Sequence, residues 1–227
     1  VIAIAIGMIV MIISVGVGYG MQKEIKDKIS SFESHITIQS FNNTINESSI
    51  NPISPELNFI DYLKSIPEIK NIERIISKFG IVRTTQDFDG LYFKGLDKNY
   101  DFSRIKKYII EGKIPSFSEN FSNDVLISKM LADKLNLKLD ESFQMLFSNL
   151  DNPNPSIIKL VVTGIYDSGF EELDLKFIIG DIRQIRRILK WEDNQISSLE
   201  IQLNDQRDLK SISESIYLNS PSEFDVI

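Results

Sequence analysis

Four carboxylates stand close together in the last third of the sequence, where they could bind a cation or act as general acids. Asp167, Glu171, Glu172 and Asp174 fall within one short segment. Carboxylate oxygens are the ligands that calcium and magnesium prefer. In an acidic chain, however, loop carboxylates are usually solvated. The sequence therefore favours a solvated acidic loop over a metal or acid–base site.

The other residues that carry chemistry do not combine into a catalytic set. The only histidine, His35, falls on the polar face of an expected strand, where a solvated or hydrogen-bonded histidine is more common than a base. Asp87 and Asp89 match part of a calcium loop, but its later ligands are missing, and Asp89-Gly90 is a hairpin turn signal. There are no cysteines and no GxxxxGK[ST] phosphate loop. We therefore expect a non-enzymatic chain without catalytic residues, metal or bound cofactor.

Basic side chains form one helical stripe. Arg183, Arg186, Arg187 and Lys190 follow an i, i+3, i+4, i+7 spacing opposite the apolar side of an expected helix. The stripe could face an acidic neighbour or lipid headgroups, but a solvated helix face is the more common reading. The whole chain has a net charge of −7. This acidity argues against nucleic-acid binding, which needs a basic surface.

The first 22 residues organise the rest of the chain. They carry no charge and are long enough to cross the roughly 30 Å hydrocarbon core of a bilayer as a helix. A cleaved signal peptide would need a basic start and a small-residue cleavage site, and neither is present. A buried core helix would rarely lack a polar position over this length. We predict a transmembrane helix over residues 1–22, and we expect a longer parent protein because the sequence starts without Met inside this apolar run.

Small residues are spaced four apart within the predicted membrane helix. Ala3 and Gly7 form one pair, and Gly16 and Gly20 form a GxxxG step. Small residues let helix backbones approach closely in lipid, although glycine is also common in membrane helices in general. We interpret these four residues as candidate helix-packing positions against another membrane helix.

The remaining residues predict a mixed α+β fold. Strand periodicity at 33–41, a helix at 55–65, a hairpin over 72–95, and a strand, helix and strand over 197–227 follow a ferredoxin-like order. A mostly β insertion interrupts this order. The predicted organisation is a transmembrane helix at 1–22, an αβ subdomain from 23–105 plus 196–227, and an inserted β subdomain at 106–195.

Several segments together resemble a transporter family. They are ISKMLADKLNLKLDESFQMLF at 127–147, VVTGIYDSGFEELDLKFIIGDIRQIRRIL at 161–189, and the Gly95-Leu96-Asp97 and Gly112-Lys113-Ile114-Pro115 motifs. They are similar to the extracytoplasmic core of lipoprotein-releasing ABC transporter permeases of the LolC/LolE group, which is related to MacB-type exporters and the FtsX division protein. The resemblance implies an inner-membrane protein with four membrane helices, of which this chain holds the first, a periplasmic porter-like αβ subdomain, and a sabre-like insertion.

The same resemblance implies partners. A separate cytoplasmic ATPase would bind ATP and magnesium, a second permease subunit or a second copy would complete the transporter, and lipoproteins would be the cargo. In LolC-type subunits a hairpin of the insertion hooks a periplasmic chaperone. The corresponding candidate partner-binding loop consists of Asn149, Leu150, Asp151, Asn152, Pro153 and Asn154. Because this loop is short and acidic, a LolE-like role or a homodimer stays open.

Other functions fit parts of the same sequence. Within the superfamily, the alternatives are a MacB-like exporter of peptides or small molecules and an FtsX-like regulator of cell-wall hydrolases. A membrane receptor with an extracytoplasmic sensing domain is the alternative from a different class.

Overall fold

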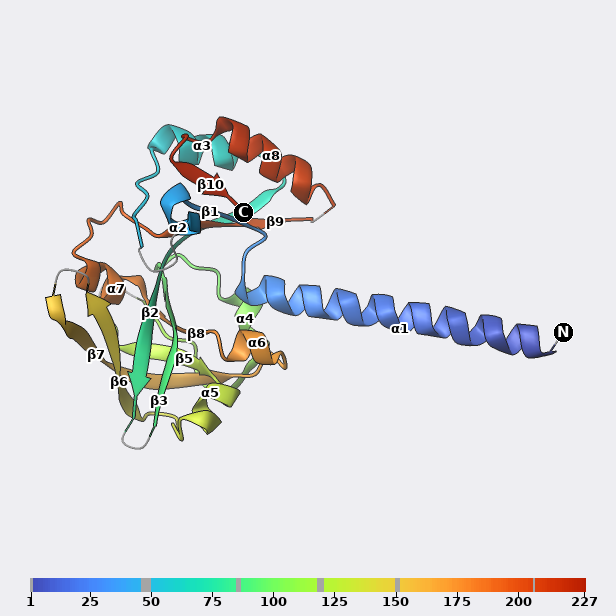
Figure 1. Cartoon of the computed structure of the whole chain (residues 1–227), viewed down its shortest axis with the longest axis horizontal. Helices are drawn as coiled ribbons and strands as arrows, with labels where there is room; N and C mark the ends of the chain where they lie inside the picture. Colours follow the sequence, from blue (N-terminus) through green and yellow to red (C-terminus); the bar gives the residue numbers. More distant parts are fainter. Residues whose placement is uncertain (1, 46–49, 85–86, 118–120, 150–151, 206) are drawn as a thin grey trace.

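A single long helix precedes the folded part of the chain (Figure 1). The computed structural model describes residues 2–45, 50–84, 87–117, 121–149, 152–205 and 207–227. Helix α1 (Ile2–Phe32) has 31 residues, and its apolar window lies entirely exposed with a mean hydropathy of 2.4. It continues without a break from the apolar run into the polar segment 22–32. The predicted membrane helix and its polar extension are therefore one element, which ends inside the folded domain.

Helices and strands alternate irregularly along the rest of the chain. The helices are α2 (Phe41–Ile45), α3 (Leu57–Ser65), α4 (Ser103–Lys106), α5 (Lys129–Lys134), α6 (Glu171–Asp174), α7 (Ile182–Leu189) and α8 (Leu209–Asn219). The strands are β1 (Ile36–Ser40), β2 (Ile69–Arg83), β3 (Phe88–Leu96), β4 (Ile109–Gly112), β5 (Asp124–Ser128), β6 (Ser142–Asn149), β7 (Asn152–Tyr166), β8 (Phe177–Asp181), β9 (Ser198–Leu203) and β10 (Phe224–Val226). This mixture confirms the predicted α+β class.

One part of the fold is a four-stranded antiparallel sheet in the order β10-β1-β9-β2. Helices α3 and α8 lie together on one side of it (Figure 1). The units β1-α3-β2 and β9-α8-β10 thus form the ferredoxin-like arrangement that the sequence order predicts. Alternating apolar residues explain the burial, because Ile36, Ile38 and Ile201 face the helices, whose Ile212 and Ile216 cover them.

The other part is a barrel. Strands pair in the cycle β2-β3-β8-β5-β7-β6 and back to β2, so the sheet closes on itself. Strand β2 belongs to both parts, since its first half pairs with β9 and its second half with β3 and β6. The predicted turn in the β2–β3 hairpin was misplaced, because Gly90 lies inside β3 opposite Ile81 while Thr84 and Asp87 are joined by a hydrogen bond at the turn.

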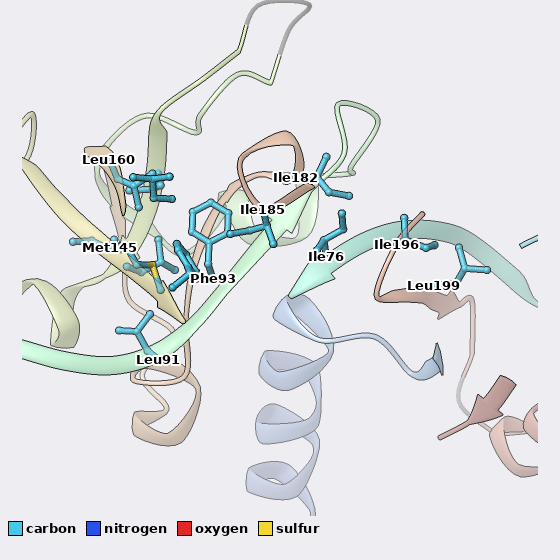
Figure 2. Close-up of a cluster of buried hydrophobic side chains, with 14 of the residues drawn as sticks. Ile76, Leu91, Phe93, Met145, Leu160, Ile182, Ile185, Ile196 and Leu199 are labelled. Atoms are coloured by element: carbon cyan, nitrogen blue, oxygen red, sulfur yellow. The ribbon is translucent and has the colours of Figure 1, made fainter. Parts of the chain in front are cut away.

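Helix α7 connects the interiors of the two parts (Figure 2). Asp181 caps its first turn by accepting a hydrogen bond from the Arg183 amide, as the sequence predicts. Ile182 and Ile185 belong to one continuous core that includes Phe93 inside the barrel and Ile196 behind the sheet. Because this core is shared, α7 holds the barrel against the sheet. The subdomain boundaries at 106 and 196 stay a prediction.

Candidate functional site

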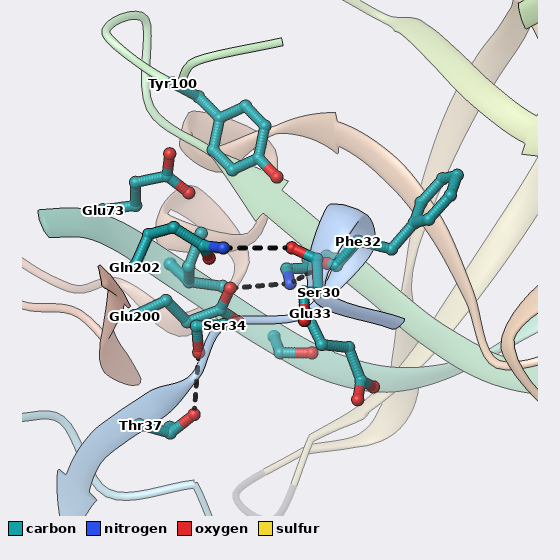
Figure 3. Close-up of polar contacts among 12 residues, drawn as sticks. Ser30, Phe32, Glu33, Ser34, Thr37, Glu73, Tyr100, Glu200 and Gln202 are labelled. Atoms are coloured by element: carbon teal, nitrogen blue, oxygen red, sulfur yellow. Dashed lines mark hydrogen bonds and ion pairs between the residues drawn. The ribbon is translucent and has the colours of Figure 1, made fainter. Parts of the chain in front are cut away.

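The end of α1 lies within a network of polar contacts, which we call the α1 junction (Figure 3). It consists of Ser30, Phe32, Glu73, Lys94, Tyr100, Arg104, Glu200 and Gln202. The Phe32 side chain is buried, with its ring centroid 4.8 Å from that of Tyr166 and 5.2 Å from that of Tyr108. The last turn of the membrane helix is therefore part of the domain core.

Two cations bind the carbonyl end of α1. The last carbonyls of a helix have no partner within the helix, and positive charge near them is favourable. Lys94 Nζ donates to the Phe32 carbonyl at 2.9 Å, and Arg104 Nη1 donates to the Ser30 carbonyl at 3.3 Å. The Gln202 amide also donates to the Ser30 carbonyl at 3.3 Å. These bonds fasten the helix terminus to β3, α4 and β9.

Two carboxylates balance these cations. Glu73 and Glu200 lie directly opposite each other on neighbouring strands β2 and β9, an arrangement that is unfavourable without a counter-charge. Arg104 bonds Glu73 at 2.7 Å and Lys94 bonds Glu200 at 2.8 Å. All four side chains are largely buried, between 6% and 13% exposed. Each cation therefore satisfies both a carboxylate and the helix end.

Burial dominates the electrostatics of the junction. It raises the pKa of Glu73, and the neighbouring Glu200 carboxylate adds to this, while Arg104 opposes it. Burial also raises the pKa of the Tyr100 hydroxyl, which accepts a hydrogen bond from Arg104 at 3.3 Å. Burial and Arg104 lower the pKa of His35, whose Nδ1 accepts from the Leu203 amide at 2.9 Å. His35 is thus a neutral structural acceptor, not an exposed base.

A small pocket of about 80 Å³ adjoins the junction. It is lined by Ile72, Glu73, Arg74, Asp97, Asn99 and Tyr100. Within the described residues, the second carboxylate oxygen of Glu73 has no hydrogen-bond partner. The pocket is far smaller than the cavities of several hundred Å³ that hold organic ligands. The geometry of this region therefore supports mechanical attachment of α1 rather than chemistry on a substrate.

Comparisons with known proteins agree with this arrangement. The model of the MacB-like periplasmic core domain matches residues 1–216. The chain belongs to this family. The family is that of ABC transporter permease subunits, which are generally non-catalytic. Membership places this MacB-like chain in the inner membrane through α1, with its folded part in the periplasm.

Individual relatives are distant. The chain is 22% identical over 226 residues to the lipoprotein-releasing system transmembrane protein LolE of Haemophilus influenzae, covering 97% of this chain and 53% of the relative. It thus spans about half the length of that relative. The extracellular domain of the ABC-type transporter YknZ from Gram-positive bacteria has a TM-score of 0.52 at 16% identity, covering 85% of this chain and 98% of YknZ's. The periplasmic region of MacB from Actinobacillus actinomycetemcomitans also gives 0.52, at 15% identity, covering 88% and 91%. These two structures support the fold.

The family motifs have structural roles in this MacB-like chain. A Cβ atom on Gly95 of β3 would lie 2.8 Å from the Cα atom of Ile182, the first residue of α7. Glycine at this position therefore lets α7 pack closely against β3. The Asp97 carboxylate accepts from the Asn99 amide at 3.0 Å and closes the turn beside the pocket. Gly112, the last residue of β4, has a φ of +74°, and a Cβ atom there would lie 2.3 Å from the Thr163 carbonyl oxygen. The two glycines therefore permit close packing against α7 and β7.

The predicted acidic cluster does not form a site. Asp167 accepts from the Gly169 amide at 2.8 Å, while Asp174 turns into the protein and accepts from the Ser168 amide at 3.3 Å. Burial raises the pKa of Asp174. Glu171 and Glu172 are exposed. No group of three metal-ligating side chains occurs in the part of the chain that the structure describes.

Asp87 and Asp89, which match part of a calcium loop in the sequence, bond to different parts of the fold. Asp87 accepts at the hairpin turn through its carbonyl, and the Asp89 carboxylate bonds Lys134 of α5 at 2.6 Å. Both positions therefore have structural partners within the fold.

The basic stripe on α7 is solvated only in part, since Arg187 and Lys190 are exposed whereas the Arg186 side chain is 11% exposed. Arg183 pairs with Asp181 at 2.5 Å, and the Arg187 guanidinium lies 4.7 Å from the Phe121 ring centroid. Arg186 is mostly buried, which lowers its pKa. Lys190 ends the helix with a left-handed φ of 56°. Partners before and after the helix, which spacing alone does not report, contact Arg183, Arg186 and Arg187.

The described residues of the candidate partner-binding loop belong to two paired strands. Strands β6 and β7 extend to Asn149 and Asn152, which pair with each other. Leu150 and Asp151 lie outside the described residues. Proline is tolerated at Pro153 because this end of β7 pairs only with β6 and leaves its other edge open. Asn154 is exposed. Partner binding by residues 149–154 stays a prediction.

The helix-packing residues lie on the exposed part of α1. Nothing approaches a Cβ position at Gly7, Gly16 or Gly20 within 4 Å, and Ala3 is exposed. With 3.6 residues per turn, Gly7 and Gly16 point in roughly opposite directions. The Ala3/Gly7 pair and the Gly16/Gly20 pair therefore lie on different sides of the helix. Their packing against partner helices stays a prediction.

Sequence reasoning missed the α1 junction. Its five charged or amide side chains on β2, β3, α4 and β9 come from positions 73 to 202. The available signal was a single charge inside an otherwise apolar strand, as at Lys94 in LYFKGL and Glu200 in SSLEIQL.

Proposed function

We propose that this chain is part of a permease subunit that extracts lipoproteins from the inner membrane in an ATP-driven transporter. In this proposal a separate cytoplasmic ATPase binds ATP and magnesium, and its motion reaches the periplasmic domain through α1. The observation that carries the proposal is the α1 junction, which joins a membrane helix to both the sheet and the barrel. The likeness to LolE along 97% of the chain supports lipoproteins as the cargo.

The geometry supports transmission of force. Only residues 33–35 separate α1 from β1, and within them Ser34 bonds Thr37 at 3.2 Å while Glu33 pairs with Lys176. A shift or rotation of α1 therefore moves β1 and the junction strands directly, because no long linker absorbs it. The proposed partners are a second permease subunit or second copy, a lipoprotein, and a soluble periplasmic chaperone that accepts it at the β6–β7 hairpin.

The test is a reconstitution of the full-length protein with the ATPase that copurifies with it. Proteoliposomes carrying a diacylated lipoprotein receive ATP and the purified chaperone, and released lipoprotein is measured in the supernatant. We expect ATP-dependent release by the natural protein. Replacing Arg104 with Gln should reduce release while leaving ATP hydrolysis in place, because the helix end loses one attachment. Lys64→Met, on the exposed face of α3, is the matched control.

Other outcomes would replace the proposal. Transport of peptides or small molecules without lipoprotein release would indicate a MacB-like exporter. Activation of a cell-wall hydrolase would indicate an FtsX-like regulator. If no ATPase copurifies with the full-length protein and a kinase module follows in its sequence, the membrane receptor would be correct.

A further inference from the structure

One outer side of the barrel carries a contiguous apolar surface, which we call the barrel patch. Its members are Phe79 and Ile81 on β2, Phe88 and Tyr92 on β3, Leu146 on β6 and Ile157 on β7. Five of them are exposed by 37% to 80%, and Leu146 is half-buried. Single exposed apolar residues are ordinary on protein surfaces, but contiguous ones mark interaction sites.

Strand register shows that the patch members are neighbours. Phe79 pairs with Tyr92 across the β2–β3 ladder. Ile81 pairs with Leu146, which in turn pairs with Ile157, so these three form a row across β2, β6 and β7. Residues that alternate with them, such as Leu91 and Phe93, fill the barrel core (Figure 2). The patch is therefore a true outer face and not a gap in the core.

The aromatic part of the patch is held in place. The rings of Phe79 and Tyr92 meet edge to face with centroids 5.5 Å apart. A Cβ atom on Gly90 would lie 2.7 Å from the Phe79 ring, so the ring rests directly on the glycine backbone. Rigid aromatic side chains lose little entropy on binding, which makes them effective contact residues.

The exposed charged positions of the same face are basic in the part of the chain that the structure describes. At the exposed outward positions of the four strands, these are Arg83 and Lys159, whereas Glu73 of β2 is buried at the α1 junction. The chain as a whole has 32 acidic and 25 basic residues. A basic, apolar face on an acidic protein complements an apolar surface bordered by carboxylates.

Two other occupants fit the face less well. A symmetric contact with a second copy would set Arg83 and Lys159 against the same cations of the partner, which is repulsive. The bilayer is out of reach, since the polar turns at 22–32 hold the domain about 16 Å above the apolar run. Strands β2, β3, β6 and β7, which carry the patch, also lie beyond the end of α1 on the side away from its apolar run (Figure 1).

We propose that the barrel patch docks a separate extracytoplasmic polypeptide that presents an apolar strip bordered by acidic side chains. Phe79, Tyr92 and Ile81 form the buried centre of the contact, and Arg83 and Lys159 form its charged rim. This surface is distinct from the 149–154 hairpin tip and does not depend on the cargo assigned under the proposed function.

The experiment is site-specific photocrosslinking of the full-length protein in its native membrane. The photoreactive residue p-benzoylphenylalanine replaces Phe79, and the control carries it at Leu218, an exposed apolar residue on α8. Mass spectrometry identifies the crosslinked peptide. We expect one polypeptide adduct at position 79, with an acidic and apolar contact sequence, that is absent at position 218. The Arg83→Glu/Lys159→Glu variant should lower its yield about tenfold, the factor that about 1.4 kcal/mol represents.

The remaining outcomes overturn the proposal. They are no adduct, a dimer of this chain, a lipid adduct, the same adduct at both positions, or an adduct that survives charge reversal. Loss of the adduct on Asn149→Ala/Asn154→Ala, with no effect of charge reversal, would place docking at the hairpin tip instead. Protease resistance of each variant in the membrane shows that it is folded.

Discussion

Replacing Lys94 with Met should destabilise the periplasmic domain strongly. Lys94 is only 7% exposed and neutralises Glu200 at 2.8 Å while donating to the Phe32 carbonyl. Without it, Glu200 stays buried directly opposite Glu73 and the helix end loses a donor. Breaking one side of a buried ion pair costs about 3–5 kcal/mol. This is a large share of the roughly 5–15 kcal/mol that keeps an ordinary domain folded.

The double variant Lys94→Met/Glu200→Leu separates the ion pair from the rest of the junction. Removing both charges avoids an isolated buried carboxylate, but the Phe32 carbonyl still loses its hydrogen bond, which costs about 1–3 kcal/mol. We therefore expect the double variant to be more stable than Lys94→Met alone. Additive effects of the two substitutions would contradict a direct interaction between the two side chains.

The assay is urea unfolding of the full-length protein in nanodiscs, followed by fluorescence of Trp191. This residue is the only tryptophan of the 227 residues and packs against the main core beside α7. Any tryptophan elsewhere in the full-length protein is replaced with phenylalanine in every variant, so that the signal reports this core. Lys64→Met serves as the control, because Lys64 and Asp61 are exposed and 3.9 Å apart, and such surface pairs contribute less than about 1 kcal/mol. A loss below about 1 kcal/mol for Lys94→Met would refute the role assigned to the junction.

Three further results follow from the structure. Gly16→Leu/Gly20→Leu should lower copurification of partner subunits if these glycines pack against another helix, whereas unchanged copurification would leave them facing lipid. The lowered pKa of His35 means that the unfolded chain binds its proton more readily, so its contribution to stability is present above about pH 6.5 and is lost as the pH falls below this value. His35→Asn should weaken the loss of stability between pH 7.5 and 5.5, and an identical pH profile would exclude this cause. Ile185→Ala should cost about 2–5 kcal/mol and increase hydrogen exchange in both β7 and β9, because its side chain belongs to the shared core; a change confined to the barrel would argue against that.

Periodicity in the sequence predicted the elements that bury one face. Ile36 and Ile38 on β1 alternate with polar residues, and Ile212 and Ile216 on α8 follow helical spacing, so each pattern reports its own burial. The uncharged first 22 residues likewise defined α1 without reference to any partner. Fold class was therefore accessible from local patterns, together with the resemblance between families.

Turn residues were less informative where tertiary contacts compete with local preference. Gly90 follows Asp89 like a hairpin turn, yet it lies within β3 because the Phe79 ring needs the space above it. The asparagines and prolines at 148–156 are residues typical of turns and loops. An open strand edge accommodates proline, so β6 and β7 nevertheless pair as far as Asn149 and Asn152.

The α1 junction could not be predicted because it is formed by contacts between residues that lie far apart in the sequence. Glu73 and Glu200 become opposed only after β2 and β9 pair, and only then do buried cations become necessary. Lys94 and Arg104 meet this need from β3 and α4, and the same cations bind the carbonyls that α1 leaves free. The helix end and the sheet thus share their counter-charges. Pulling α1 away from the domain would leave the Phe32 and Ser30 carbonyls without the donors Lys94, Arg104 and Gln202, while both cations would stay paired with their carboxylates. Displacement of α1 therefore costs these hydrogen bonds, which couple the helix end to β3, α4 and β9.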